Sequence, residues 1–265
     1  MMIPDHLDVA VLQQLLTTQT FGRPLYVLTQ TTSTNDEVKA LAIGGAPEGT
    51  VVLAEQQTHG RGRQGRPFAS PAGVGIYLSL LLRPTIDMVR LPQLTLMVAV
   101  AAADAMTALC SVSIHLKWPN DVEIAGKKVA GILTEAVLPF GEPPVVIIGI
   151  GINVNTTLEQ LPSALHDRVT SLALATGTPV SRHQLITCLL AHLEDLYHTF
   201  QDTGITSILE RWRHYGRISG RVVQFSHAAE TRTGHVIGLD DDGALLVQTA
   251  DGIQERVVSG QVIFL

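Results

Sequence analysis

Hydrophobic residues recur at two different spacings between the start of the chain and about residue 215. Apolar residues at helical spacing predict an early helix over 7–16, another over 94–109, a long one over 185–200 and a shorter one over 208–212. Short apolar runs bounded by glycine or proline predict strands over 26–28, 50–55, 75–82, 114–118, 128–137 and 145–151. Mixed elements of this kind predict a sheet covered by helices.

The pattern changes at about Ser219, after which short strands follow one another without a helix. We predict strands over 221–226, 233–239, 244–249, 254–258 and 262–265. Aspartate and glycine between them are turn signals. Short strands spaced this closely predict a small β-barrel. We therefore expect two domains, formed by residues 1–218 and residues 219–265.

Composition and charge describe a folded protein with no general affinity for polyanions. Apolar residues make up 46% of the chain and charged residues 16%, which is typical of a globular protein with a sizeable core. The net charge of −6 gives no overall attraction to nucleic acid or anionic lipid. Any polyanion must therefore be met by a local basic cluster.

The sequence gives no clear signal for a membrane or a secretory route. The longest apolar stretch, 94–108, contains polar residues and is too short to span a bilayer. The start of the chain has no basic region followed by a long apolar run. Cys110 and Cys188 lie far apart in apolar helical contexts, as reduced core cysteines do. We expect a cytoplasmic protein with no membrane partner.

Residues 60–66 (GRGRQGR) combine three arginines with three glycines directly after a predicted strand. Glycine lets the backbone approach a ligand, and arginine offers a permanently charged fork for phosphate or carboxylate oxygens. The run is not a Walker A loop, because no Gly-Lys-Ser/Thr follows. In an acidic chain it favours a specific small anion. A solvated basic loop and a flexible RNA-binding segment remain open.

Residues 117–121 (KWPND) follow another predicted strand. Proline fixes an extended bend that brings an aromatic ring, an amide and a carboxylate close together. Trp118 could stack on a base, Asn120 could bond to polar edges, and Asp121 could hold Mg²⁺ or accept a proton. A turn with a core tryptophan explains the same residues equally well.

Two glycine-containing strand segments carry further polar residues. In residues 126–135 (GKKVAGILTE), a lysine entering a buried site would suit a carboxylate or phosphate, although lysine also protects edge strands. In residues 146–155, glycines at alternate positions let a group approach the sheet before Asn153 ends the run. A buried central strand explains the rest of that segment.

Residues 33–37 (STNDE) have the features of a helix start. Thr34 and Glu37 are spaced as in a capping box. The free N–H groups of such a helix end suit a polar ligand. A capped helix without a ligand is the plainer interpretation.

Together, the motifs STN, GRGRQGR, KWPND, KVAGIL (128–133) and GIGIN (149–153) occur in an order that resembles the biotin–protein ligase family, the biotin–[acetyl-CoA-carboxylase] ligases. The resemblance extends over residues 32–265. It implies an α+β fold, with a catalytic domain related to class II aminoacyl-tRNA synthetases and a C-terminal SH3-like β-barrel.

Carried over by motif, the resemblance also implies site residues. The biotin site would contain Ser33, Thr34, Asn35, Gln57, Gly60, Arg61, Gly62, Arg63, Lys128 and Gly131. The nucleotide site would contain Arg61, Arg63, Lys117, Trp118, Asn120 and Asn153. Arg63, Lys128 and Asp121 would be catalytic, with Asp121 either holding Mg²⁺ or assisting the incoming lysine.

The family reaction has two steps. Biotin and MgATP give biotinyl-5′-AMP and pyrophosphate, and the biotinyl group then passes to one lysine of a biotin carboxyl carrier domain. The resemblance therefore implies biotin and ATP as substrates, Mg²⁺ as their companion ion and the carrier protein as partner. Homodimers are common in the family. Residues 1–28 are too short for a DNA-binding domain, so we expect the ligase-only form with no DNA partner.

The chain departs from the family pattern at two positions and leaves three alternatives. His59 stands where small residues are common, and Phe68 stands where a tryptophan often packs. Lipoate ligases and octanoyltransferases share the fold, but they lack the paired GRGRxGR and KWPND motifs. A non-catalytic biotin or nucleotide sensor would release no pyrophosphate. An RNA-binding protein would show steeply salt-dependent affinity for RNA.

Overall fold

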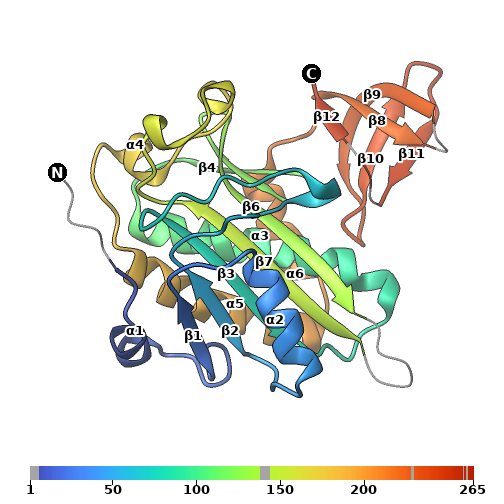
Figure 1. Ribbon diagram of the computed structural model, residues 1–265. Helices are drawn as coiled ribbons and strands as arrows, with labels where there is room; N and C mark the ends of the chain where they lie inside the picture. Colours follow the sequence, from blue (N-terminus) through green and yellow to red (C-terminus); the bar gives the residue numbers. More distant parts are fainter. Residues whose placement is uncertain (1–5, 138–143, 228–229, 259, 261) are drawn as a thin grey trace.

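A seven-stranded mixed sheet forms the centre of the larger part of the molecule (Figure 1). The computed structural model describes residues 6–137, 144–227, 230–258, 260 and 262–265. The strand order is β1-β2-β3-β7-β6-β5-β4, in which β1 and β2 are parallel and the other neighbours are antiparallel. The strands are β1 Leu25–Leu28, β2 Val51–Ala54, β3 Gly75–Leu82, β4 Ile114–Lys117, β5 Asp121–Ile124, β6 Lys127–Val137 and β7 Val145–Asn153.

Helices cover both faces of this sheet, as Figure 1 shows. The main core lies between the sheet and the helices α3 (Leu91–Leu109), α5 (Arg182–Thr203) and α6 (Thr206–Gly216). On the opposite face, α2 (Thr34–Ile43) covers a smaller apolar cluster that includes Val38 and Ile147. The shorter helices are α1 Val9–Leu15, α4 Leu172–Thr176, η1 Arg63–Gly65, η2 Met88–Arg90, η3 Leu158–Gln160 and η4 Ser163–Leu165.

The two faces follow from alternation along the central strands. On β7, Ile148, Ile150 and Ile152 belong to the main core, whereas Ile147 belongs to the cluster under α2. Gly149, Gly151 and Asn153 occupy the same alternate positions as Ile147. The α2 side of the sheet is therefore covered by an apolar cluster at one end. At the other end, the glycines leave space on the sheet that other side chains occupy.

One helical segment of the described chain, Met88–Leu109, is long and apolar enough to cross a membrane by length and composition. It is longer than the stretch 94–108 considered from the sequence, because the helix and the turn before it begin further upstream. Of the most apolar 18-residue stretch of this segment, 67% is buried inside the protein. This burial is what a core helix requires.

A second, five-stranded antiparallel sheet follows α6 and lies at the upper right in Figure 1. Its order is β11-β10-β9-β8-β12, with β8 Val222–His227, β9 Glu230–Leu239, β10 Leu245–Thr249, β11 Gln254–Val257 and β12 Val262–Phe264. Side chains of the larger part donate to the main chain of this C-terminal part. Among the described residues, these bonds include Trp118 Nε1 to Gly243 O at 3.1 Å, Gln93 Nε2 to Asp242 O at 3.2 Å and Arg213 Nη2 to Leu239 O at 3.2 Å.

Most predicted elements are confirmed with small shifts at their ends, and β3 is confirmed with both bounds. The short strand β5 and the helix α4 were not predicted. The predicted C-terminal strands are confirmed as one antiparallel sheet, while its description as a barrel stays a prediction.

Candidate functional site

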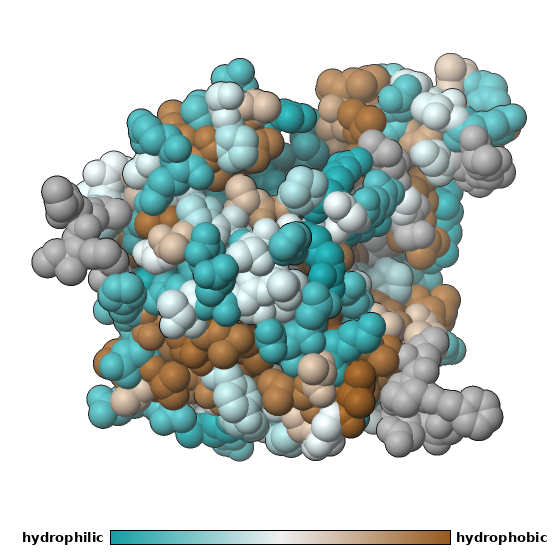
Figure 2. All heavy atoms as spheres, in the orientation of Figure 1, coloured by the Kyte–Doolittle hydropathy of each residue, from teal (hydrophilic) through white to brown (hydrophobic). Residues whose placement is uncertain are grey.

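A cavity of about 840 Å³ brings together segments that are far apart in the sequence. Its lining comes from the start of α2, the loop after β2, the turn between β4 and β5, and the strands β6 and β7. Residues within 161–169, together with Gly260 and the strand Val262–Phe264, complete it. Figure 2 shows a recess between the larger part and the C-terminal sheet, with many hydrophilic residues around it.

The cavity contains nearly all of the residues predicted for the site. Those lining it are Ser33, Thr34, Asn35, Gln57, Arg61, Gly62, Arg63, Lys117, Trp118, Asn120, Asp121, Lys128, Gly131 and Asn153. Gly60 is the exception. It is buried behind the loop, where an added Cβ would lie 2.6 Å from both Phe68 O and Ser70 Oγ. Its role is therefore to let the loop pass close to its own return segment.

Three glycines of β6 and β7 form the floor of the cavity, and we call Gly131, Gly149 and Gly151 the glycine floor. Gly131 and Gly151 are register partners on the two strands. A Cβ on Gly151 would lie 2.6 Å from Cε1 of Phe68, and one on Gly131 would lie 2.8 Å from Nζ of Lys128. The absent side chains therefore make room for an aromatic ring and an ammonium group directly on the sheet.

Lys128 and Asp121 form an ion pair at this floor. Nζ of Lys128 donates to Oδ1 of Asp121 at 2.6 Å. The main chain of Lys128 is held from the other side, because its N–H donates to Arg168 O and its C=O accepts from Thr170 N, both at 2.9 Å. The lysine is thus held through its main chain and through its ammonium group, while 31% of its side-chain surface stays accessible.

Residues 60–66, which we call the arginine loop, bring three arginines to the cavity lining: Arg61, Arg63 and Arg66. Arg63 donates to Oδ1 of Asn120 at 3.3 Å and to the carbonyl oxygen of Gly260 at 3.2 Å. Burial lowers the pKa of Arg63, an effect that the nearby charge of Asp121 opposes. Arg61 instead donates to Oδ2 of Asp36 at 2.6 Å and also binds the second carboxylate oxygen. Arg61 and Arg63 therefore have different surroundings.

Hydrogen bonds at the start of α2 differ from the predicted capping box. The helix begins at Thr34 with Ser33 as N-cap, and the Ser33 hydroxyl makes no capping hydrogen bond. Thr34 donates through both its N–H (2.9 Å) and its Oγ1 (3.1 Å) to Oε1 of Gln57. Glu37 accepts from Thr31 Oγ1 rather than capping the helix. The capping-box prediction is wrong because a distant glutamine and Thr31 take the groups that the box would pair.

Two of the predicted nucleotide residues, Asn120 and Asn153, use their amide nitrogens within the protein. Nδ2 of Asn120 donates to Ile132 O at 3.0 Å, and Nδ2 of Asn153 donates to Thr170 O at 3.1 Å. Oδ1 of Asn153 is buried with no hydrogen-bond partner within the described chain. Such an atom is costly unless a ligand or water donates to it.

Lys117 and Trp118 serve the structure as well as the cavity. Nζ of Lys117 lies 3.1 Å from Oε1 of Glu123 and over the ring of Phe264. Trp118 is only 3% exposed, and its indole N–H donates a hydrogen bond to the carbonyl oxygen of Gly243. Most of this ring packs in the core, and little of it is available for stacking on a base.

Several lining residues were not predicted from the sequence. They are mainly in residues 161–169, which include Asp167 and Arg168, and in the last strand, which includes Phe264. Phe68 stood out in the sequence only as a departure from a family pattern, although its ring lies against Gly151 and near Gly131. No local motif marks these residues, because only the fold brings them to the cavity.

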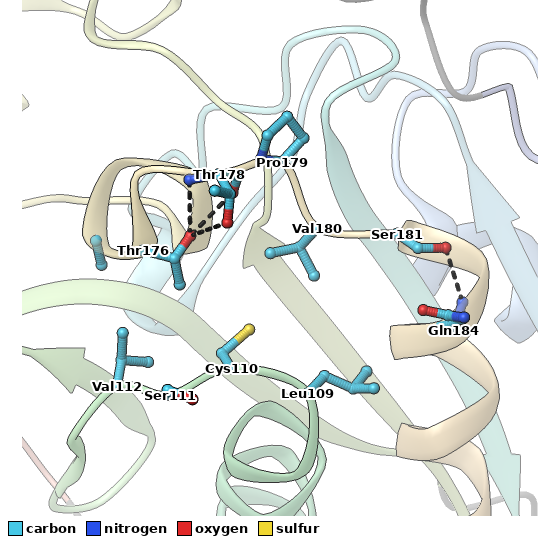
Figure 3. Close-up of a pocket in the computed structure, with 11 residues that line it drawn as sticks. Leu109, Cys110, Ser111, Val112, Thr176, Thr178, Pro179, Val180, Ser181 and Gln184 are labelled. Carbon is cyan, nitrogen blue, oxygen red and sulfur yellow. Dashed lines mark hydrogen bonds between the residues drawn. The ribbon is translucent and has the colours of Figure 1, made fainter.

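A second hollow of about 420 Å³ lies between the end of α3 and the start of α5 (Figure 3). None of its described lining residues carries a charge. The hydroxyl groups of Thr176 and Thr178 bond within the same loop, and Ser181 Oγ accepts from Gln184 N (Figure 3). Burial raises the pKa of the Cys110 thiol at its edge, which disfavours the thiolate. The larger cavity is therefore the better candidate site.

The described part of the chain contains no group of three or more His, Cys, Asp or Glu that could hold a metal ion. A divalent cation at Asp121 would therefore need most of its ligands from a substrate. Mg²⁺ accepts this arrangement, since it is commonly held by one or two carboxylates, waters and substrate phosphates.

Comparisons with known proteins agree over most of the chain. The model of the Biotin/lipoate A/B protein ligase family matches residues 27–153, and that of the Biotin protein ligase C terminal domain matches residues 218–265. A bifunctional ligase/repressor BirA from Bacillus spizizenii is 38% identical, covering 95% of this chain and 78% of that protein. A biotin--[acetyl-CoA-carboxylase] ligase from Mycobacterium tuberculosis is 37% identical, covering 95% of this chain and 93% of that protein.

Solved structures give the same result for the fold. A biotin protein ligase from Aquifex aeolicus in complex with biotin and ATP superposes with a TM-score of 0.80 at 30% identity. The match covers 91% of this chain and 98% of that one.

Proposed function

The chain belongs to the biotin protein ligase family, and from this premise we propose that it activates biotin with ATP and transfers it to a lysine of a biotin carboxyl carrier domain. The family resemblance stated from the motifs is thereby confirmed. The two-step reaction, its acceptor and the roles of single residues are our proposal for this chain.

The observation that carries the proposal is the single cavity in which all the sequence motifs meet. It holds cations, hydroxyl groups, amides and a glycine floor within about 840 Å³. A site for joining two substrates needs this combination, since it must bind both and align their reacting atoms.

In the first step, a carboxylate oxygen of biotin attacks the α-phosphorus of ATP, and pyrophosphate leaves. Both reactants are anionic, so they repel one another until cations lie between them. Arg63 and Lys128 line the cavity and supply those charges. They would also stabilise the charge that develops on the phosphoryl oxygens. We assign Lys128 to the carboxylate and α-phosphate, and Arg63 to the phosphate.

Polar groups at the start of α2 would hold the far end of biotin. Ser33, Thr34 and Gln57 present hydroxyl and amide groups to the cavity. Gln57 is oriented from both sides, because it accepts from Thr34 and donates to Ser70 Oγ at 3.1 Å. A cyclic urea offers both N–H donors and a C=O acceptor, and such a polar cluster can discriminate strongly in its favour. The Gly131 backbone would meet biotin beside Lys128.

The opposite end of the cavity would bind the nucleotide. The unpartnered Oδ1 of Asn153 is a hydrogen-bond acceptor that an amino group of a base can satisfy. Asn120 and Lys117 complete this end, while Trp118, which is 3% exposed, contributes mainly to the packing of its wall. Phe68 on the glycine floor would separate the two ends and cover the acyl chain.

Mg²⁺ would neutralise triphosphate charge and would arrive with ATP. Asp121 is the carboxylate that we assign to it, because Asp121 lies beside Lys128 and lines the cavity. In the second step, the acceptor lysine attacks the acyl carbon and AMP leaves. The same carboxylate would orient the incoming amine.

The finer description of the architecture is also a proposal. We assign residues 1–218 to a catalytic domain of the class II aminoacyl-tRNA synthetase type and residues 219–265 to an SH3-like domain. The change from a helix-covered sheet to an all-antiparallel sheet after α6 supports this boundary. A cytoplasmic location, expected from the sequence, and a homodimer, which is common in the family, stay proposals.

The decisive experiment incubates the protein with biotin, MgATP and a biotin carboxyl carrier domain. Mass spectrometry of the carrier should show one added biotinyl group on one lysine, and pyrophosphate should appear only when biotin is present. Lipoate and octanoate replace biotin in parallel reactions, because the matching family also includes lipoate ligases. Transfer of lipoate in preference to biotin, or no transfer at all, would overturn the proposal.

A further inference from the structure

Two of the three cavity arginines of the arginine loop, Arg61 and Arg63, differ in the charge of their partners. The third, Arg66, donates to Oε1 of Gln64 within the same loop at 3.4 Å. Arg61 faces carboxylates: both of its terminal nitrogens bind Asp36, and Nη2 lies 4.0 Å from Oε2 of Glu135. Within the described residues, Arg63 has only neutral hydrogen-bond partners, the amide of Asn120 and the main chain of Gly260. The charge of Arg61 is thus compensated inside the protein, while that of Arg63 remains available to an anion.

The carboxylates around Arg61 are anchored in the sheet. Glu135 on β6 accepts from Nδ2 of Asn35 at 2.6 Å, and Oδ1 of Asn35 accepts from Ser79 Oγ on β3 at 2.5 Å. Asp36 is the next residue of α2. The loop is therefore connected through Arg61 to the start of α2 and to two central strands.

Gly149 explains why this connection forms. An added Cβ on Gly149 would lie 2.3 Å from Oδ1 of Asn35 and 3.0 Å from its Nδ2. Only glycine at this position lets the Asn35 amide lie flat on β7 and reach Glu135 on the neighbouring strand. The first glycine of the GIGIN motif, Gly149, thus makes room for Asn35 rather than for a ligand.

We propose that Arg61, Asp36 and Glu135 form a clasp that holds the arginine loop over the cavity. The clasp leaves the charge of Arg63, already assigned to the phosphate, available to the substrate. Asp36 and Glu135 are then positioning residues. This assignment divides two roles that the motif resemblance gave to both arginines together. The part that concerns substrates rests on the proposed function, whereas the anchoring of the loop does not.

The clasp acts on the fraction of molecules whose loop is closed. An arginine that binds both oxygens of one carboxylate is a strong, directional pair, although partial exposure weakens it. The side chains of Arg61 and Asp36 are 35% and 45% exposed. An apparent binding constant falls in proportion to the closed fraction. Losing the clasp should therefore weaken biotin binding several-fold and leave the chemical step nearly unchanged.

Limited trypsin digestion tests the clasp in the absence of substrates. Cleavage after Arg63 requires the loop to open, so its rate reports the open population. We expect Asp36→Asn to speed this cleavage about fivefold. The charge exchange D36R/R61D restores an ion pair between the two positions. The rate of cleavage after Arg63 should then return to within about twofold of the parent rate, since loop opening controls that rate. Asp104→Asn, which breaks a comparable pair with Arg211 between α3 and α6, is the matched control and should not change it.

Steady-state kinetics of pyrophosphate release tests the division of roles. We expect Asp36→Asn and Glu135→Gln to raise the KM for biotin about fivefold with kcat within about twofold, and D36R/R61D to restore KM, as a population effect requires. Arg63→Ala should lower kcat by about 100-fold or more, as expected when a group that stabilises the transition state is removed. Thermal melting of each variant checks that the fold is intact.

The results separate this inference from the proposed function. Unchanged cleavage and unchanged KM in Asp36→Asn would overturn the clasp, and so would an Arg61→Ala variant with the kcat loss expected of Arg63→Ala. If the parent protein released no pyrophosphate with biotin and ATP, the proposed function would fail, and the trypsin result would still decide whether the clasp exists.

Discussion

Nζ of Lys128 lies 2.6 Å from Oδ1 of Asp121, across the neighbouring strands β6 and β5. Register places Asp121 opposite Gly131, and the pairing shifts by one residue between Val122 and Glu123. This irregularity lets the lysine, three residues before Gly131, lean over the glycine floor. The ammonium group is therefore in position before a substrate arrives, which lowers the cost of organising the site.

Replacing Lys128 tests its proposed contact with both reacting groups. Lys128→Ala should reduce biotin-dependent pyrophosphate release by about 10²–10³-fold, the loss seen when one preorganised charge-stabilising donor is removed. The neighbouring Lys127 is the control, because its Nζ binds His166 O and the residue does not line the cavity. A Lys128→Ala enzyme with the parent rate would remove the residue from the mechanism.

The packing of Phe68 on Gly151 predicts a coupled pair of substitutions. Gly151→Ala places a Cβ 2.6 Å from the Phe68 ring, so we expect overpacking to cost about 1–3 kcal/mol and to weaken biotin binding. Phe68→Leu in the same chain should relieve part of the loss. Denaturant unfolding and calorimetric titration with biotin measure both effects. Gly238→Ala, where the nearest atom lies 4.0 Å from the new Cβ, is the matched control.

Additive effects of the two substitutions would contradict the contact. Residues that touch show interaction energies of about 0.5–3 kcal/mol in a double-mutant cycle, whereas separate residues do not.

Glu194 predicts a loss of stability in acid. Burial raises its pKa, but three backbone N–H groups, those of Phe21, Gln19 and Thr20, outweigh this and hold the pKa below its ordinary value of 4.5. A carboxyl with a lowered native pKa stabilises the fold above its unfolded pKa, and this stabilisation is lost as the pH falls through the native pKa. The parent protein should therefore lose this contribution below about pH 4.5.

Glu194→Gln isolates that contribution. At neutral pH we expect it to lower the free energy of unfolding by about 1–3 kcal/mol, since hydrogen bonds to a buried charged acceptor are lost. The difference from the parent should shrink as the pH falls below 4.5. Asp195→Asn, at the exposed next position, should change little. Urea unfolding at several pH values gives the comparison, and a difference that does not depend on pH would exclude the charged state as its cause.

The Trp118–Gly243 hydrogen bond predicts a structural rather than a catalytic effect. Trp118→Phe keeps most of the buried ring and removes the indole donor, so stability should fall by about 1 kcal/mol. The KM for ATP should stay within about threefold of the parent value, because a ring that is 3% exposed offers little surface to a base. A large rise in that KM with unchanged stability would assign the ring to nucleotide stacking.

Local pattern was sufficient for elements whose boundaries are chemically marked. The strand Gly75–Leu82 was predicted with both ends, since glycine precedes an apolar run and Arg83-Pro84 follows it. The strand Asp121–Ile124 was missed, because its short, partly charged sequence follows the Pro119 bend. It becomes a strand through pairing with both β4 and β6. Such pairing is context, which local propensity does not contain.

The chemistry available to the site is visible in the chain before it folds: arginines and glycines in one loop, Lys128 three residues before Gly131, and family motifs in a fixed order. Which of these groups face each other depends on the fold. It paired Arg61 with Asp36 but left Arg63 with neutral partners, and it placed Phe68 across two register-paired glycines. The physical reason is that periodicity and turn chemistry act between neighbours in the chain. Charge pairing and close packing instead depend on distances that only the folded sheet sets.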